Sequence, residues 1–423
     1  MEIGALVKEL QSGISARGTS GYWEMPRLQG RGGGEGSGGG IPRIAWSFDS
    51  GLPDPATFPI DDLCRITEDV LRTDAEHGLQ YGGIAHGGIG YGWEGLRQII
   101  VDRTRAADGR DFDLRSVMLT SGGAHALTIA CDTFLEEGDV FCVEAPTWGA
   151  VLNSGRRCGA EAISVPMDHD GLDVDALEAE LVRLRAEGRR LKMLYTITTF
   201  NTPTGWSLSL PRRRRVLELA DEYEFIVLED NVYGELRYDG EHIPTLLSLD
   251  TEGYVVRVDS FSKTLAPALR MGSVTGAPEV VAAMSCVRGD LGVSQFLARV
   301  VAKYVAEGLY DKHVTMVNEL YRRKRDLAAA ALREHCGELV TFDSPDGGFF
   351  HWLRIADEVD GAQVMTKAME NGVQCRPGER FFGESEQDLH TQYLRMAFSM
   401  VPEAELERGV MALAQAMQDS VQA

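Results

Sequence analysis

The chain has 423 residues, of which 44% are hydrophobic and 25% are charged, and its formal net charge at pH 7 is −22. This length allows two or more domains with a large core, and the composition is typical of a soluble globular protein. The acidic balance argues against nucleic acid or an anionic membrane as a partner, and no apolar run approaches the roughly 20 residues that a membrane helix requires.

Two sequence features concern the cellular compartment. The seven cysteines show no C-x-x-C spacing, which is typical of reduced thiols rather than of a disulfide framework. The first apolar run contains Glu2, Lys8 and Glu9, which argues against a signal peptide. We therefore expect a cytoplasmic protein, and we expect no metal site.

The N-terminal part of the chain is irregular. Residues 2–11 have the apolar spacing of a short helix, whereas residues 30–40, GRGGGEGSGGG, are of low complexity. This run indicates a flexible linker or insertion. The alternative, a glycine-rich anion loop, is not favoured because no strand precedes the run and no helix follows it.

A second glycine-rich stretch follows a helix expected over residues 60–77. Residues 90–95 match G-x-G-x-x-G, but a dinucleotide site requires a buried strand just before this motif. Residues 79–89 do not supply such a strand. The stretch is better interpreted as a loop, and His86 within it is either a bystander or an additional acid–base group.

From residue 96 onward helices and strands alternate, which predicts a parallel sheet with crossover helices. Strands are expected at 117–119, 140–143, 162–165, 193–198, 225–228 and 254–258. Helices are expected at 95–107, 124–136, 174–188 and 211–223. The tail differs, with a long helical region at 294–335, strands within 342–353 and 394–398, and helices at 361–371 and 402–418. We predict an N-terminal arm (1–50) that joins the small domain, a large domain (51–300) and a small C-terminal α+β domain (301–423).

Polar residues follow the carboxyl ends of the expected strands, where open parallel sheets bind their ligands. They are Gly123, Trp148, Asn201, Thr202, Asp230, Tyr233 and Lys263. The turn before Gly123 joins a strand to a helix, and the free N–H groups of such a helix end suit a phosphate.

Lys263 is the most informative of these residues. It is one of only seven lysines against 35 arginines, and it follows the strand within Ser260-Phe261-Ser262-Lys263-Thr264. Burial lowers the pKa of a lysine, and the neutral amine can form a Schiff base with a carbonyl. The alternative is a surface lysine at a helix start.

The remaining chain supplies partners for a lysine that binds pyridoxal phosphate (PLP). Asp230, after an apolar strand, would meet the pyridine nitrogen, although it could also be a surface carboxylate, a role for which Glu229 is the better candidate. Tyr233 would reach the phenolate oxygen or simply pack. Arg395 lies in an apolar strand and needs a buried anion, either a substrate carboxylate or a structural ion pair. Arg270 could bind a phosphate.

From about Phe48 to Ser399 the chain resembles the fold-type I PLP-dependent aminotransferases of class I/II, and in particular their aminoadipate/kynurenine and MocR-like branch. The resemblance is carried by SFSKTLAP (260–267) with LRMG (269–272), by LEDNVYGEL (228–236), and by PTG (203–205) with Leu394-Arg395. It implies an α/β fold in which a large domain with a mostly parallel central sheet is joined to a smaller α+β domain.

The resemblance also implies roles for individual residues. Lys263 would be the Schiff-base lysine, with Asp230 and Tyr233 on the cofactor ring and Arg395 on the substrate carboxylate. The phosphate would be held by Ser260, Ser262, Arg270 and the amides of Gly123 and Ala124. Tyr81 would reach the neighbouring subunit's phosphate, which implies a homodimer with shared active sites. Gly51 would approach the substrate through its backbone. Apart from the resemblance, we expect bulk near Trp148, the 82–95 loop and the segment around Arg17 to set the side-chain specificity.

The chain departs from the family pattern around the cofactor. Thr202 stands where an asparagine usually donates to the phenolate oxygen, so that either the Thr202 hydroxyl substitutes for it or Asn201 reaches round. The stacking aromatic residue, usually tyrosine, is Trp148. Gly123-Ala124 lacks the polar side chain that often follows the phosphate turn.

Three functions compete on this basis. The first is an aminotransferase that moves the amino group of an L-α-amino acid to a 2-oxo acid through Lys263. The second is a repurposed lyase, decarboxylase, oxidase or cyclase of specialised metabolism that acts on an amino acid through the same quinonoid intermediate. The third, a PLP-sensing regulator domain, is disfavoured because the segment before Phe48 has no room for a winged helix.

Overall fold

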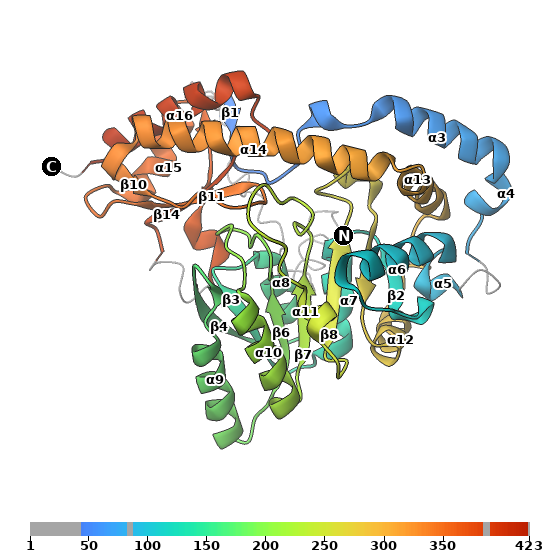
Figure 1. Cartoon of the computed structure of the whole chain (residues 1–423). Helices are drawn as coiled ribbons and strands as arrows, with labels where there is room; N and C mark the ends of the chain where they lie inside the picture. Colours follow the sequence, from blue (N-terminus) through green and yellow to red (C-terminus); the bar gives the residue numbers. More distant parts are fainter. Residues whose placement is uncertain (1–43, 83–87, 384–389, 422–423) are drawn as a thin grey trace, which may run out of the picture.

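The computed structural model describes residues 44–82, 88–383 and 390–421 (Figure 1). The predicted helix over 2–11, the glycine run 30–40, Arg17 and His86 lie outside these residues. In the described part of the chain, no helix is long and apolar enough to cross a membrane.

An eight-stranded sheet forms the centre of the larger part of the molecule. Its order is β2-β9-β8-β7-β6-β3-β4-β5. Six strands are parallel to one another, and β9 and β5 run antiparallel to their neighbours. The strands are β2 (Val117–Thr120), β3 (Val140–Ala145), β4 (Glu161–Asp168), β5 (Gly171–Leu172), β6 (Leu191–Thr196), β7 (Ile226–Asp230), β8 (Val255–Ser260) and β9 (Gly272–Thr275). The predicted mostly parallel sheet is thus confirmed.

Helices cover both faces of this sheet, because its central strands are apolar on both sides. Phe141 and Val143 of β3 pack with one set of helices, whereas Val140 and Cys142 pack with the other. The first set is α7 (Gly123–Phe134), α8 (Gly149–Arg157) and α12 (Pro278–Val287). The second set is α9 (Val174–Ala186), α10 (Leu210–Tyr223) and α11 (Leu246–Leu249).

A third group of helices packs beside β2 at one side of the sheet (Figure 1). It comprises α3 (Ile60–Thr73), α4 (Ala75–Gly78), α5 (Gly88–Tyr91), α6 (Glu94–Asp108) and α13 (Gln295–Ala306). The predicted helix over 60–77 is therefore broken at Asp74, and the G-x-G-x-x-G segment joins α5 to α6 and does not follow a strand.

The C-terminal part forms a smaller α+β unit, as predicted. A four-stranded antiparallel sheet has the order β10-β11-β14-β13, and β1 pairs with β12. The strands are β1 (Trp46–Ser47), β10 (Val340–Thr341), β11 (Phe350–Ile355), β12 (Val373–Gln374), β13 (Arg376–Pro377) and β14 (Tyr393–Ala397). The helices are α14 (Leu309–His335), α15 (Gly361–Glu370) and α16 (Glu403–Gln418). Short 3₁₀ turns occur at Pro55–Thr57, Leu114–Ser116, Pro267–Leu269, Gly337–Leu339 and Gly378–Phe381.

The long helix α14 crosses above the large sheet toward the small unit (Figure 1). Its buried Lys324 donates through Nζ to Asp54 Oδ2 and to the carbonyl oxygen of Ser399, both at 2.6 Å. The hydroxyl of Tyr321 accepts from the Asp54 amide at 2.9 Å, and Ser399 Oγ donates to the Leu52 carbonyl at 2.6 Å. These bonds fix the segment just before α3, which enters the site described next.

Candidate active site

Lys263 lies just beyond β8, at the carboxyl edge of the large sheet. Its Nζ donates to the carbonyl oxygen of Gly51 at 2.6 Å and lies 5.7 Å from the ring centre of Tyr233. Burial, helped by the charge of Arg395, lowers the pKa of Lys263 to about 8, although Asp230 acts in the opposite direction. An appreciable fraction of this side chain is therefore a neutral, nucleophilic amine near neutral pH.

Asp230 ends the neighbouring strand β7 and is only 2% exposed. Its carboxylate accepts from Tyr195 Oη at 2.8 Å and from the Val232 amide at 3.3 Å. Burial raises the pKa of Asp230 to about 6, while these two hydrogen bonds lower it. Within residues 44–82, 88–383 and 390–421 it forms no direct ion pair, and the nearby charge of Lys263 also lowers its pKa.

Two residues near Asp230 in the sequence, Tyr233 and Glu229, are both buried. Tyr233 is buried, with its ring edge-on to Phe349 and Phe350. Glu229, which we expected on the surface, is fully buried, so that prediction was wrong. It points away from Asp230 and accepts from Thr198 Oγ1 and from the first amides of α11. Helices cover this face of the sheet as well, and the backbone amides at the start of α11 donate hydrogen bonds to the Glu229 carboxylate.

The first turn of α7 adjoins the lysine loop. Gly122 precedes this helix with a φ of +81°, and the guanidinium of Arg270 lies against it, since a Cβ on Gly122 would be 2.9 Å from Nη1. A side chain at this position would thus meet both backbone strain and a cation. Gly123 and Ala124 carry the first amides of the helix, next to this guanidinium.

Two hydroxyls complete the same corner. Ser260 Oγ donates to Ser262 Oγ at 3.0 Å and accepts from the Ser262 amide at 3.2 Å. The Cβ of Ser260 is 3.9 Å from the position that a Cβ on Gly123 would occupy. A helix start, a guanidinium and two hydroxyls together form an anion-binding corner suited to phosphate.

Arg395 enters from β14 of the small sheet. It is 7% exposed, and its guanidinium carbon lies 4.1 Å from the ring centre of Phe350 and 4.9 Å from that of Phe381. It donates to the backbone carbonyl of Asp49 and, at 3.2 Å, to Thr202 Oγ1. Its Nε is buried without a hydrogen-bond partner in the described ranges. Burial lowers the pKa of Arg395 to about 10. It is a buried cation with an unused donor.

The structure separates the two candidates for the phenolate contact. The Asn201 amide group is already engaged, because Nδ2 donates to Glu144 Oε2 at 2.7 Å and Oδ1 accepts from Thr204 Oγ1 at 3.1 Å. Thr202 Oγ1 instead lies against Arg395. Thr202, not Asn201, is therefore the residue whose side chain lies beside the other site residues.

Sequence reasoning missed Glu144, a 1% exposed carboxylate near the carboxyl end of β3. It accepts from Thr196 Oγ1 at 2.6 Å, the Ile197 amide at 2.9 Å and Asn201 Nδ2 at 2.7 Å. Burial raises the pKa of Glu144 to about 7, and Asp230 contributes in the same direction. The glutamate thus holds the loop that carries Thr202. Its signal in the sequence was a lone acid within the apolar run VFCVEA.

The other predicted site residues are placed as follows. Gly51 supplies its carbonyl to Lys263, and a Cβ on it would be 2.3 Å from Phe350 Cζ. Trp148 is half-buried just beyond β3, at the start of α8. Tyr81 is 72% exposed and lies on the surface of this chain, so the structure does not bring it into the cluster.

The cluster fits pyridoxal phosphate. Asp230 offers a buried carboxylate without a direct ion pair to a protonated pyridine nitrogen, and the corner at Gly122, Ser260 and Arg270 offers amides, hydroxyls and a cation to the phosphate. Lys263 offers an amine to the aldehyde. Each chemical group of the cofactor has a suitable partner.

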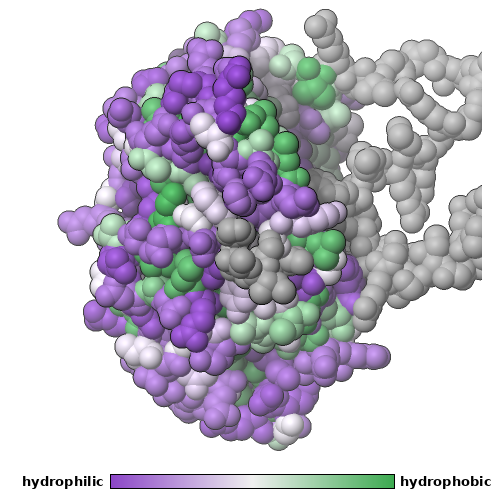
Figure 2. Space-filling view, turned by 90° about the vertical axis from the view of Figure 1, so that its right-hand side faces the viewer, coloured by the Kyte–Doolittle hydropathy of each residue, from purple (hydrophilic) through white to green (hydrophobic). Residues whose placement is uncertain are grey.

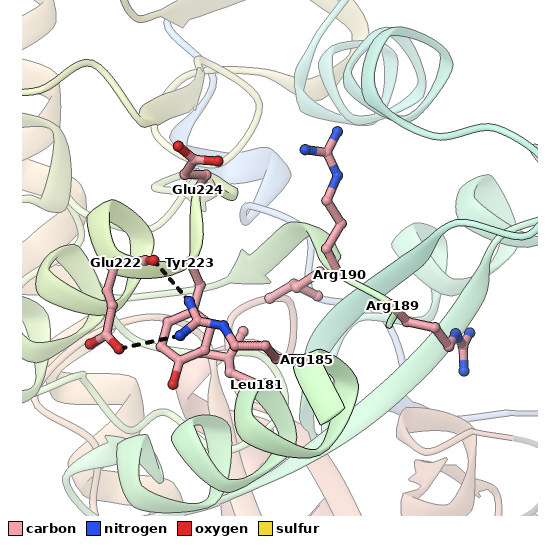
Figure 3. Close-up of a pocket in the computed structure, with 8 residues that line it drawn as sticks. Leu181, Arg185, Arg189, Arg190, Glu222, Tyr223 and Glu224 are labelled. Atoms are coloured by element: carbon pink, nitrogen blue, oxygen red, sulfur yellow. Dashed lines mark hydrogen bonds and ion pairs between the residues drawn. The ribbon is translucent and has the colours of Figure 1, made fainter. Parts of the chain in front are cut away.

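A separate surface pocket of about 210 Å³ has a different character (Figure 3). It is lined by arginines such as Arg185 and Arg190, with Glu222 and Tyr223. Arg185 stacks on the Tyr223 ring and donates to the Glu222 carbonyl at 3.1 Å. These residues precede β6 and β7, so the pocket lies toward the amino ends of the strands and does not belong to the lysine site.

Fold and site together define the class of protein, a PLP-dependent enzyme of fold type I. The family model described as "Aminotransferase class I and II" matches residues 95–413. The chain therefore belongs to this family, and it is an aminotransferase.

Individual proteins agree with this assignment. The chain is 35% identical over 377 residues to aromatic-amino-acid aminotransferase 1 of Thermococcus litoralis, covering 89% of this chain and 88% of the relative. It resembles the crystal structure of Pyrococcus horikoshii kynurenine aminotransferase, in complex with PMP, with a TM-score of 0.88, 31% identity and coverage of 99% and 100%. It also resembles the α-aminoadipate aminotransferase LysN of Thermus thermophilus, complexed with N-(5'-phosphopyridoxyl)-L-leucine, with a TM-score of 0.80, 28% identity and coverage of 89% and 92%. The cofactor is pyridoxal phosphate.

Proposed function

We propose that this aminotransferase takes its amino group from L-α-amino acids with aromatic side chains and passes it to a 2-oxo acid. The observation that carries the proposal is the placement of Arg395, a buried cation with an unused Nε donor, against the rings of Phe350 and Phe381. Trp352 stacks on Tyr393 nearby in the same sheet, with ring centres 5.2 Å apart. Names of similar proteins, an aromatic-amino-acid and a kynurenine aminotransferase, support the same substrate class.

Arg395 would bind the α-carboxylate of the substrate with its guanidinium. Its unused Nε would become a donor to this carboxylate, and charge-assisted pairs of this kind fix both position and orientation. The Thr202 hydroxyl oxygen already accepts a hydrogen bond from Arg395. The hydroxyl could therefore donate its own hydrogen to the phenolate oxygen of the cofactor. Tyr233 would be the second donor to that oxygen. The substrate is thereby oriented with its Cα toward Lys263.

The cofactor would be held at three places. Asp230 would pair with the pyridine nitrogen and Trp148 would stack on the ring, while Asn201 would hold the loop of Thr202 in place through its bond to Glu144. The phosphate would bind Ser260, Ser262, Arg270 and the amides of Gly123 and Ala124. Gly51 would lie against the substrate, because its lack of a side chain leaves room beside Phe350.

Lys263 would act as the general base and acid. Pyridoxal phosphate, when bound, would supply an electron sink for the electron pair of the Cα–H bond. Lys263 Nζ would take the proton from the Cα atom of the substrate. Its pKa of about 8 suits this task, since general bases work best near the ambient pH.

We also propose a cytoplasmic homodimer in which Tyr81 completes the partner's phosphate site. Tyr81 and Leu79 are 72% and 69% exposed, and Ile60 on α3 is 60% exposed. Figure 2 shows the face on the side of α3 to α6, where hydrophobic surface lies among hydrophilic residues. The expected domain division, with the arm 1–50, the large domain 51–300 and the small domain 301–423, is part of the same proposal, as is a contribution of Arg17 to specificity.

The amino-acid specificity is tested with the purified holoenzyme and no acceptor. A panel of phenylalanine, tyrosine, tryptophan, kynurenine, 2-aminoadipate, aspartate and alanine is added in turn, and conversion to the pyridoxamine phosphate form is followed by absorbance. We expect the aromatic amino acids to react with the highest kcat/KM, and a 2-oxo acid to reverse the change. A preference for aspartate or alanine would contradict the proposed substrate class.

The shared site is tested by mixing two inactive variants. In a heterodimer of Lys263→Ala and Tyr81→Ala subunits, one of the two sites keeps both residues intact if Tyr81 acts across the interface. We expect activity to return toward a quarter of the wild-type value. No recovery in a mixture shown by mass spectrometry to contain heterodimers would place Tyr81 outside the partner's site.

A further inference from the structure

A second arginine lies beside Arg395 and was not anticipated from the sequence. β13 pairs with β14 so that Arg376 is directly opposite Arg395. Side chains of opposite residues in an antiparallel pair lie on the same face, with Cβ atoms about 5 Å apart. Arg376 therefore starts from the same face of the small sheet as the arginine of the active site.

Asp49 connects the two guanidinium groups. Arg376 pairs with its carboxylate, Nε to Oδ1 at 2.7 Å and Nη2 to Oδ2 at 2.8 Å, while Arg395 donates to its backbone carbonyl. The side chain of Arg376 is 35% exposed and that of Asp49 is 14% exposed, whereas Arg395 is buried. Two cations thus contact a residue with a single carboxylate, which is paired with Arg376, and the three groups together keep a surplus positive charge.

The ion pair uses only one edge of the Arg376 guanidinium. Nη2 donates one hydrogen bond to Asp49, whereas Nε lies close to Oδ1 without making a hydrogen bond, and Nη1 has no hydrogen-bond partner among the residues that the structure describes. The edge formed by Nη1 and Nη2 presents parallel N–H groups, which match a carboxylate in a bidentate pair. Arg376 is able to bind a second carboxylate without leaving Asp49.

We propose that Arg376 forms a subsite for the distal carboxylate of a short dicarboxylic 2-oxo acid whose α-carboxylate lies on Arg395. This proposal rests on the role given above to Arg395. When the substrate has an aromatic side chain, Asp49 neutralises Arg376, so the cation is not left beside an apolar group without compensation. When the acceptor is dicarboxylic, its distal carboxylate pairs with the surplus positive charge at Arg376. One site thereby serves an apolar donor and a doubly charged acceptor.

The test compares two acceptors with the same amino donor. 2-Oxoglutarate carries the distal carboxylate, and 2-oxohexanoate is of similar length but lacks it. In Arg376→Gln we expect the ratio of kcat/KM for these two acceptors to fall at least tenfold, and in Arg376→Lys to fall less, because a point charge replaces the fork. The matched control is Arg323→Gln, which breaks the surface pair Arg323–Glu403 and should leave the ratio within twofold.

A binding measurement separates this proposal from the proposed function. Glutarate and butanoate, which cannot be transaminated, are titrated into the holoenzyme by calorimetry. Arg376→Gln should lose at least tenfold in glutarate affinity, and Asp49→Asn should gain affinity because a negative charge beside the subsite is removed. Equal affinity of wild type and Arg376→Gln for glutarate, or an equal loss with both acceptors, would overturn the subsite even if aromatic donors react as proposed.

Discussion

Glu144→Gln tests the electrostatics of the site through a change in folding stability. The carboxylate is 1% exposed and accepts three hydrogen bonds. Burial raises its pKa from an ordinary 4.5 to about 7. Because the folded-state pKa is raised, the folded protein holds this proton more tightly. The resulting stability is fully present below pH 4.5 and is lost as the pH rises through about 7.

The size of this effect follows from the shift. A difference of about 2.5 pKa units between unfolded and folded states corresponds to about 3.5 kcal/mol, at about 1.4 kcal/mol per unit. Glutamine carries no charge and lacks this dependence, but its amide nitrogen faces a donor, which costs about 1–2 kcal/mol at every pH. The wild type should therefore be more stable than the variant at pH 5, and less stable by about 1.5–2.5 kcal/mol at pH 8.

Urea unfolding of both proteins at pH 5, 6, 7 and 8, at one protein concentration and without cofactor, measures the difference. Asp230→Asn serves as an internal check, since Asp230 contributes to the raised pKa of Glu144. In the Asp230→Asn variant, the pH range over which Glu144 changes the free energy of unfolding should move to lower pH. A stability difference that is constant from pH 5 to pH 8 would refute the reasoning, because Glu144 would then not titrate in this range.

Three further substitutions have outcomes that the structure defines. Arg395→Gln should raise the KM for amino acids roughly 100-fold, since charged hydrogen bonds contribute about 1.5–3 kcal/mol; an unchanged KM would place the α-carboxylate elsewhere. Gly51→Ala should destabilise the protein by about 1–3 kcal/mol in thermal unfolding because its Cβ would lie 2.3 Å from Phe350, and an unaltered Tm would contradict that clash. Thr202→Val should shift the pH at which the bound cofactor changes its absorption spectrum while Thr202→Asn restores it; identical spectra in Thr202→Val would remove the hydroxyl from the phenolate contact.

Much of the fold was predictable because the parallel strands are short apolar runs separated by helical spacing. The strands after which Lys263 and Asp230 stand are of this kind, so the residues were found from their position. By contrast β9, with the sequence GSVT, was missed since four residues without an apolar run leave no strand signal. The break between α3 and α4 at Asp74 left no glycine or proline as a marker.

Site residues were predictable from the sequence where they stand at the end of a strand. They were not predictable where their role depends on contacts with residues far away in the sequence. Glu229 was misjudged because its donors come from α11, which lies farther along the sequence. Glu144 and Arg376 were missed for the same reason, since their partners Asn201 and Asp49 are far away in sequence. The choice between Thr202 and Asn201 likewise required the positions of both side chains.

The central claim is that Lys263 is the lysine that holds the cofactor. Borohydride reduction of the holoenzyme, followed by digestion and mass spectrometry, identifies the lysine that carries the reduced cofactor. Lys324 provides a sharp comparison, since it is also buried but is paired with Asp54. Our account predicts modification of Lys263 and none in Lys263→Ala, with the fold retained by circular dichroism. A modified Lys324, or an adduct that persists in Lys263→Ala, would contradict it.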